Sequence, residues 1–89
     1  MNNLTFTQAL EGYFIFAQSR LSKNTLQDYA NTFKKFQDFL GVDLEMNQID
    51  PAQIEAFLSS FRHLKKKTLL NYHTGLSALW TWAYDRKIV

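Results

Sequence analysis

The sequence of 89 residues contains no cysteine, one proline and three glycines. The lack of cysteine excludes a disulfide framework and thiolate metal sites, and it is compatible with a reducing compartment. The scarcity of proline and glycine leaves few residues for tight hairpin turns, and no long segment alternates apolar with polar side chains. We therefore expect an all-α fold with no β-sheet.

The sequence also has little of the chemistry that a catalytic or metal site needs. His63 and His73 are its only histidines, and neither is spaced to pair with a carboxylate. It contains no glycine-rich phosphate loop and no metal motif such as H-E-x-x-H. The N-terminus has no basic n-region, and the apolar segment 13–17 is too short to span a bilayer. These absences predict a soluble intracellular protein without a catalytic site, a metal site or a cofactor.

Apolar residues recur at steps of three and four along most of the chain, which predicts helices. With 46% hydrophobic and 16% aromatic residues, a chain of this length can form one core and one domain. We expect a compact four-helix domain with helices near 5–20, 22–40, 51–61 and 65–86. The shared spacing predicts one core that contains Tyr29, Phe33, Phe57, Leu76 and Trp80.

Local signals mark the ends of these helices. Thr5 and Asp50 are each followed three residues later by glutamine, as in a capping box, and Ser22 is a third N-cap. Gly41 occupies the position where a left-handed residue ends a helix. The segment 42–49 has no clear period, so we expect a loop with Phe39 packed beneath it.

Some residues lie away from the apolar stripes or interrupt a helix. Ile15 and Phe16 of the first helix are either covered by a neighbouring helix or part of an interface patch. Trp82 lies off the main stripe of the fourth helix, and we expect it to contact a part of the molecule outside this sequence. Gly75 costs that helix about 1 kcal/mol relative to alanine. We expect a close approach at Gly75, either of another helix or of a ligand.

Positive charge is concentrated near the start of the fourth helix, although the formal net charge is only +2. No acidic residue occurs between Glu55 and Asp85, and this interval contains Arg62, Lys65, Lys66 and Lys67. Cations at a helix N-terminus are disfavoured by about 0.3–1 kcal/mol each. The lysines therefore form either a solvated face or a binding site for an anion such as phosphate, which Thr68 would also contact.

The second and fourth helices begin with the same formula, K-x-T-L-x-[D/N]-Y, at Lys23–Tyr29 and Lys66–Tyr72. The segment Ser22-Lys23-Asn24-Thr25 therefore offers groups similar to those at the start of the fourth helix. The exposed face of the second helix is rich in Asn and Gln, whose amides can form hydrogen bonds with adenine edges in the DNA major groove. The repeated opening favours DNA as the anion that these two helix starts bind.

Four segments of the sequence, in their order and spacing, resemble the N-terminal core-binding domain, often called SAM-like, of tyrosine recombinases and phage integrases. They are Leu4-Thr5-Phe6; Leu21-Ser22-x-x-Thr25-x-x-x-Tyr29 with Phe33, Phe36, Phe39 and Leu40; Ile49-Asp50-x-x-x-Ile54-x-x-Phe57-Leu58; and Lys67-Thr68-Leu69 continuing to Leu76-x-x-Leu79-Trp80-x-Trp82-Ala83. The resemblance covers almost the whole chain.

The resemblance implies a domain that clamps one side of a recombination core site, with its second and fourth helices in the major groove. The residues at the family's DNA-contacting positions are Ser22, Thr25, Gln27, Asn31 and Lys34 in the second helix and Lys67, Thr68, Asn71 and Gly75 in the fourth. Lys65 stands where the family often has serine, so the fourth helix lacks a capping hydroxyl. Asp28 would face phosphates unless it accepts from a cytosine amino group or from a neighbouring lysine.

The resemblance also implies that the catalytic arginines, lysine, histidine and tyrosine belong to a separate C-terminal domain. We accordingly expect residues 1–89 to be an N-terminal fragment of a longer bacterial or phage recombinase in the cytoplasm. Its expected partners are double-stranded DNA, the catalytic domain of the same polypeptide and other recombinase protomers, with no membrane. One alternative is a helical protein–protein interaction module with Ile15, Phe16 and Trp82 as its interface. Another is a small enzyme, for which the chain supplies no nucleophile with a base.

Overall fold

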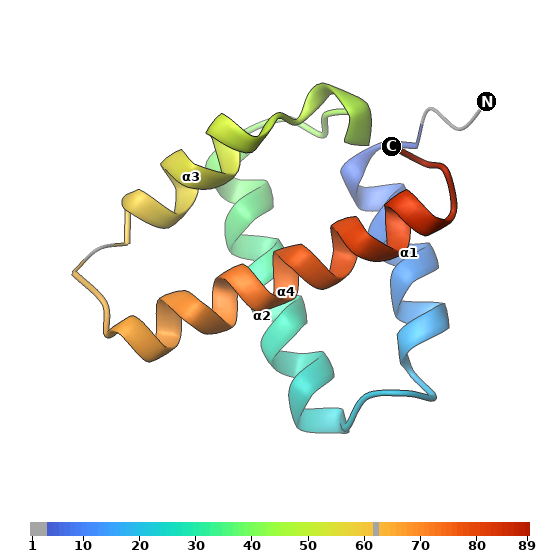
Figure 1. Ribbon diagram of the computed structural model, residues 1–89, viewed down its shortest axis with the longest axis horizontal. Coiled ribbons are helices and arrows are strands. Elements are labelled where there is room, and N and C mark those ends of the chain that lie inside the picture. Colours follow the sequence, from blue (N-terminus) through green and yellow to red (C-terminus); the bar gives the residue numbers. More distant parts are fainter. Residues whose placement is uncertain (1–3, 62) are drawn as a thin grey trace.

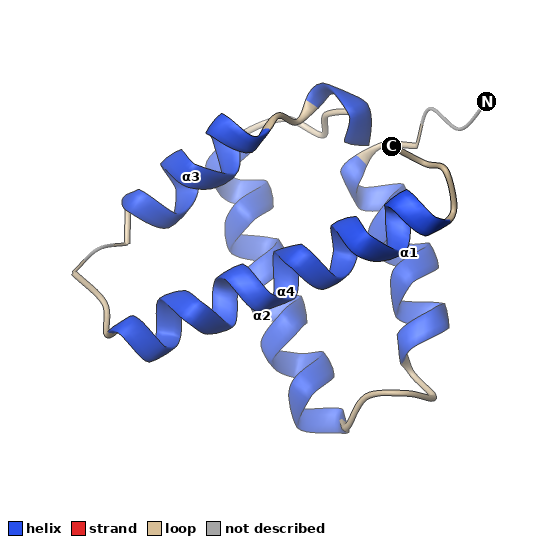
Figure 2. Cartoon of the chain, viewed as in Figure 1, coloured by secondary structure: helices blue, strands red, loops and turns tan. Residues whose placement is uncertain are grey.

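Two long helices, α2 (Lys23–Leu40) and α4 (Lys66–Asp85), cross near their middles and form the centre of the fold (Figure 1). The computed structural model describes residues 4–61 and 63–89. Helix α1 (Phe6–Ala17) packs against both long helices, and α3 (Pro51–Ser59) packs against α4. The described residues contain no strand, and their regular structure is helical throughout (Figure 2). The expected all-α fold of four helices is confirmed.

The predicted helix starts are present because each depends on neighbouring residues alone. Thr5 Oγ1 accepts from the backbone N–H of Gln8, whose side chain accepts from the Thr5 N–H in return. Asp50 forms the same reciprocal pair with residue 53 at the start of α3. Ser22 Oγ accepts from the Thr25 N–H at 3.2 Å. By contrast, Lys65 precedes α4 without a side-chain capping bond.

The helix ends differ in how they stop. Gly41 ends α2 in the left-handed conformation, with φ of 78°, as its position predicts. Helix α1 ends at Ala17, three residues before the expected end. After α4 the chain forms a Schellman motif, in which the Ile88 N–H donates to the Ala83 carbonyl at 2.9 Å. Lys87 supplies the left-handed residue of this motif, with φ of 59°, and Ile88 folds back into the core.

Aromatic rings from all four helices make up much of the core. Phe36 lies at its centre, with its ring 5.4 Å from that of Phe6 and 5.1 Å from that of Phe57, both in edge-to-face geometry. Such pairs add about 0.5–1.5 kcal/mol each to the stabilisation from burial. Of the five predicted core residues, Phe33, Phe57 and Leu76 are buried, whereas Tyr29 and Trp80 are partly buried and pack against the core.

The segment 42–49 is more ordered than its sequence suggested. It contains the short 3₁₀-helix η1 (Met46–Gln48), and Met46 and Ile49 are both buried. An isolated antiparallel bridge joins Glu45 to Thr5. Phe39, expected beneath this segment, is 42% exposed; its ring stacks on Phe36 and lies edge-to-face with Phe57. A segment of this length is too short to show a helical period.

The expectation for Trp82 was wrong. Its side chain is buried against α1, with the indole 5.8 Å from the Tyr13 ring. Gly12 makes room for it, since a Cβ at that position would lie 2.9 Å from Trp82 Cη2. Phe16 is partly buried beside Trp82, and the Arg20 guanidinium lies 4.2 Å from the centre of its ring. Ile15 remains 70% exposed.

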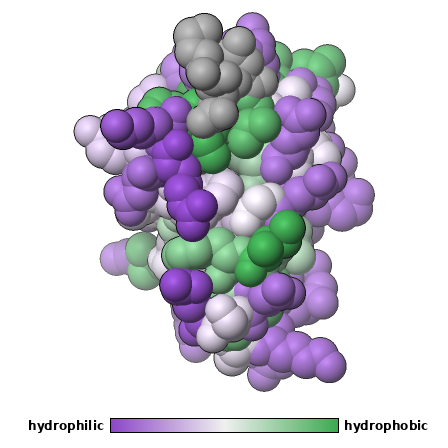
Figure 3. Space-filling view, turned by 90° about the vertical axis from the view of Figure 1, so that its right-hand side faces the viewer, coloured by the Kyte–Doolittle hydropathy of each residue, from purple (hydrophilic) through white to green (hydrophobic). Residues whose placement is uncertain are grey.

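The surface on the α1 side of the molecule carries an apolar band between hydrophilic areas (Figure 3). Exposed Ile15 belongs to α1, so one residue of the expected interface patch is on the surface. In the two described ranges, none of the helices has the length and hydropathy that a membrane span requires.

Candidate nucleic-acid interface

A polar groove lies between α2 and α4. It has a volume of about 220 Å³ and is lined by Asp28, Asn31, Thr32 and Lys35 from α2 and by Thr68, Asn71 and Tyr72 from α4. Three of the predicted site residues, Asn31, Thr68 and Asn71, therefore lie around one hollow although they come from two helices. A neighbouring hollow of about 280 Å³ along α2 adds Lys34 to the same surface.

The crossing of the two helices at Tyr29 and Gly75 creates this groove. A Cβ at residue 75 would lie 3.3 Å from Tyr29 Cδ1, so the missing side chain lets α4 approach the ring closely. Gly75 is buried in this contact. Of the two explanations for the glycine, the structure shows the helix crossing, and we remove Gly75 from the residues expected to meet DNA.

Hydrogen bonds along α2 determine which groups the groove offers. Gln27 Nε2 donates to Asn31 Oδ1 at 3.3 Å, which leaves the Asn31 amino group without a protein acceptor among the described side chains. The Thr32 hydroxyl turns back to the Asp28 carbonyl at 3.1 Å. Lys34 and Asp38 form a 3.9 Å ion pair that is largely exposed, and such pairs contribute little to stability. Lys34 therefore remains able to exchange this partner for another anion.

The start of α2 carries four further predicted residues. Ser22, Lys23 and Asn24 are exposed, and Thr25 is partly buried. Ser22 Oγ donates to Thr25 Oγ1 at 2.9 Å while it accepts from the Thr25 N–H, so both hydroxyls are engaged in the cap. The first turns of α2 and α4 lie at separate ends of the crossed pair (Figure 1). The two similar helix openings thus contribute unequally to the groove: residues 66–72 supply Thr68, Asn71 and Tyr72, whereas residues 23–29 supply Asp28 alone.

The start of α4 is strongly positive. Lys65, Lys66 and Lys67 are exposed, and the first turn of α4 has no acidic side chain. Across residues 4–61 and 63–89, the one ion pair present joins Lys34 to Asp38, so none of these three lysines is neutralised by a described carboxylate. The positive end of the helix dipole adds to their potential. Arg62, the remaining basic residue of this interval, lies outside the described residues.

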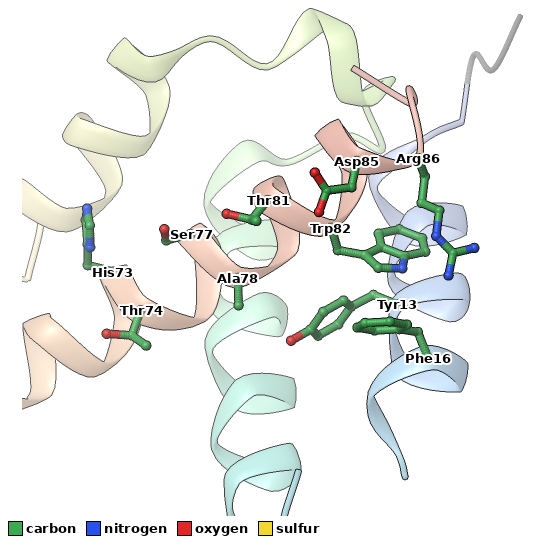
Figure 4. Close-up of a pocket in the computed structure, with 10 residues that line it drawn as sticks. All are labelled: Tyr13, Phe16, His73, Thr74, Ser77, Ala78, Thr81, Trp82, Asp85 and Arg86. Carbon is green, nitrogen blue, oxygen red and sulfur yellow. The ribbon is translucent and has the colours of Figure 1, made fainter. Parts of the chain in front are cut away.

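A larger hollow of about 520 Å³ lies between α1 and α4, on the other side of the crossing (Figure 4). Tyr13, Phe16 and Trp82 form its aromatic side. The rest is lined by small α4 residues such as Ser77 and Ala78 and by the larger polar side chains of His73, Asp85 and Arg86. Burial, with a smaller contribution from Tyr29, raises the pKa of Tyr13. Small residues at steps of three and four on α4 are the sequence signal that would have indicated this hollow. No group of acidic or histidine side chains able to hold a metal occurs within the described chain.

The fold and the groove define a small helical domain with a polar surface formed by two crossed helices. The sequence matches the family model described as phage integrase, N-terminal SAM-like domain, over residues 10–87, and the chain belongs to this family. Comparisons with curated proteins and with solved structures found no significant match. The family is that of the non-catalytic N-terminal domain of integrases.

Proposed function

We propose that this chain is the DNA-binding domain of a tyrosine recombinase and that it clamps one side of the recombination core site. The observation that carries this proposal is the groove between α2 and α4, which gathers two asparagines, two threonines and a lysine beside un-neutralised lysines. In this proposal residues 1–89 form one domain of a longer recombinase. Its partners are duplex DNA, the catalytic domain that carries out strand cleavage, and other protomers on the DNA.

The two kinds of groups have different roles. Lys23, Lys34, Lys65, Lys66 and Lys67 contact phosphates, together with Ser22, Asn24 and Thr25 at the start of α2 and Thr68 at the start of α4. Gln27, Asn31 and Asn71 reach base edges, because their amides can both donate and accept. An α-helix with its side chains is about 10–12 Å across, and the major groove is about 12 Å wide. One of the two crossed helices, α2 or α4, therefore fits within the major groove of DNA.

The test is a titration of labelled duplex with wild-type protein and with a variant in which Lys65, Lys66 and Lys67 are replaced by alanine. Without a cognate site the wild type should bind in the non-specific range, with Kd of about 10⁻⁴–10⁻⁶ M at moderate salt. Loss of three phosphate contacts should reduce the slope of log affinity against log salt by roughly 2.7. Lys87→Ala, which removes one exposed charge beyond the end of α4, is the control and should leave the slope unchanged.

Equal affinities and equal slopes for the wild type and the triple variant would contradict the proposal. The lysines would then be a solvated face. In that case the interaction module becomes the better explanation, because Ile15 is 70% exposed on the α1 surface.

A further inference from the structure

Asp28 is the only acidic residue among those that line the α2–α4 groove in the described parts of the chain. It is exposed, and no described lysine or arginine lies within ion-pairing distance of its carboxylate. A carboxylate in this position repels phosphates and so weakens binding to every DNA sequence. Its place on the proposed DNA surface therefore requires a compensating contact.

The neighbour of Asp28 on the same face of α2 is Asn31, three residues further along the helix. Residues at this spacing have Cβ atoms about 5–6 Å apart. The Asn31 oxygen already accepts from Gln27 Nε2 at 3.3 Å, so its amino group is the part left to donate. An ionised carboxylate can only accept. The groove thus presents an acceptor, Asp28, beside a donor, Asn31.

In the major groove, C·G and A·T pairs both place a donor beside an acceptor, and the usual partner of a carboxylate there is the cytosine amino group. In the major groove, cytosine presents its N4 amino group as a donor, and the paired guanine presents O6 and N7 as adjacent acceptors. We propose that Asp28 makes the α2–α4 groove selective for a C·G pair by accepting from cytosine N4 while Asn31 donates to guanine. Thymine at the Asp28 position would place its O4 acceptor against the carboxylate. This inference rests on the proposed function, since it names a base that the DNA-binding surface selects.

The proposal predicts two opposite effects of Asp28→Asn. Removing the charge should increase affinity for duplexes of random sequence, because phosphate repulsion is lost. It should also relax the preference for cytosine, because the asparagine amide can donate as well as accept and so tolerates other bases. A residue with a purely structural role would not raise non-specific affinity and lower selectivity together.

The experiment is selection from a duplex library with a randomised segment, followed by sequencing of the bound fraction. Wild type, Asp28→Asn and Glu55→Gln are compared; Glu55→Gln makes the same charge change at an exposed position on α3. Wild type and Glu55→Gln should enrich cytosine at one position by about tenfold over Asp28→Asn. Placing N4-methylcytosine there should weaken wild-type binding by about tenfold and leave Asp28→Asn unchanged, because the methyl group replaces the hydrogen that faces the major groove.

Each outcome has a defined meaning. If Asp28→Asn enriches the same cytosine as wild type, or if wild type enriches adenine instead, the selectivity assigned to Asp28 is wrong. If Asp28→Asn binds all duplexes more tightly with an unchanged preference, the carboxylate only repels phosphates, and the inference fails while the proposed function stands. If wild type binds no duplex at all, the proposed function fails and the inference with it.

Discussion

Tyr29 and Gly75 meet where α2 and α4 cross, and a Cβ at residue 75 would come within 3.3 Å of the Tyr29 ring. A second contact of this kind occurs between α1 and α4, where a Cβ at Gly12 would lie 2.9 Å from Trp82. Both glycines lie within helices, and both leave room for an aromatic ring from another helix. The two contacts differ in the freedom of the ring to move, because Tyr29 is partly exposed and Trp82 is buried.

We predict that Gly12→Ala is less stable than Gly75→Ala by about 1–2 kcal/mol. Alanine improves helix propensity by about 1 kcal/mol at each site, and crowding opposes this gain by about 1–3 kcal/mol where the neighbour cannot move. The Tyr29 ring can shift, so Gly75→Ala should remain within about 1 kcal/mol of wild type. Urea denaturation measures both variants. A less stable Gly75→Ala would show that the helix crossing is the tighter contact.

Leu76→Ala should lower the free energy of unfolding by about 2–5 kcal/mol, because Leu76 is 2% exposed and its removal leaves a cavity. Leu70→Ala is the matched control on the same helix, since Leu70 is 56% exposed. It should change stability by less than about 0.5 kcal/mol. Similar denaturation midpoints for the two variants would remove Leu76 from the core.

Lys65→Ser should stabilise the domain and weaken DNA binding. Serine would supply the side-chain cap that α4 lacks, a gain of about 0.5–2 kcal/mol, and it removes a positive charge from the helix start. Lys65→Ala removes the same charge without adding a cap. Comparing the two variants by thermal unfolding and by duplex titration separates the cap from the charge. Equal unfolding temperatures for them would show that serine does not cap α4.

Asp43 should make stability depend on acidic pH. Its Oδ1 accepts from the Thr7 N–H at 3.0 Å, which attaches the loop after α2 to the start of α1. Burial raises the pKa of Asp43, but hydrogen bonds from Thr7 and Thr5 lower it, and the net pKa lies below its ordinary value of 3.8. Because the folded pKa is the lower one, this stabilisation is complete above the unfolded pKa and is lost as pH falls through the folded pKa.

Asp43→Asn should therefore be less stable than wild type near neutral pH, and the difference should shrink as pH falls below about 4. Denaturation midpoints measured from pH 7 to pH 2 check this expectation. A difference that stays constant over the whole range would mean that ionisation of Asp43 does not contribute.

The sequence predicted the helices and their starts well because these depend on residues within one or two turns. Thr5, Ser22 and Asp50 each cap through a bond to a residue three positions later. Trp82 was placed wrongly because its environment depends on Gly12, which is 70 positions earlier in the sequence. Spacing along α4 shows that Trp82 leaves the main stripe, but it does not show which helix covers that side.

The candidate site was predictable in part. The repeated helix opening indicated Thr68 and Asn71, and the amide-rich face of the second helix indicated Asn31; the structure places all three around one groove. Lys35 and Tyr72 line the same groove but were not among the residues expected to meet DNA. Which side chains share a groove depends on the angle at which α2 and α4 cross. No local pattern in the sequence specifies that angle.

The contact between Tyr29 and Gly75 lies where α2 and α4 cross, so a small change in the crossing angle would displace residues far along each helix. Lys67 lies eight residues before Gly75, which is about 12 Å along α4 at about 1.5 Å per residue. A rotation of about 10° at the crossing would therefore move Lys67 by about 2 Å, which is several times the range of about 0.5 Å over which hydrogen-bond distances vary. In the proposed DNA complex, the spacing of the DNA groups that the domain contacts at once thus depends on the contact between Tyr29 and Gly75. If the proposed function holds, substitutions at this contact should change DNA preference without altering any residue that touches DNA.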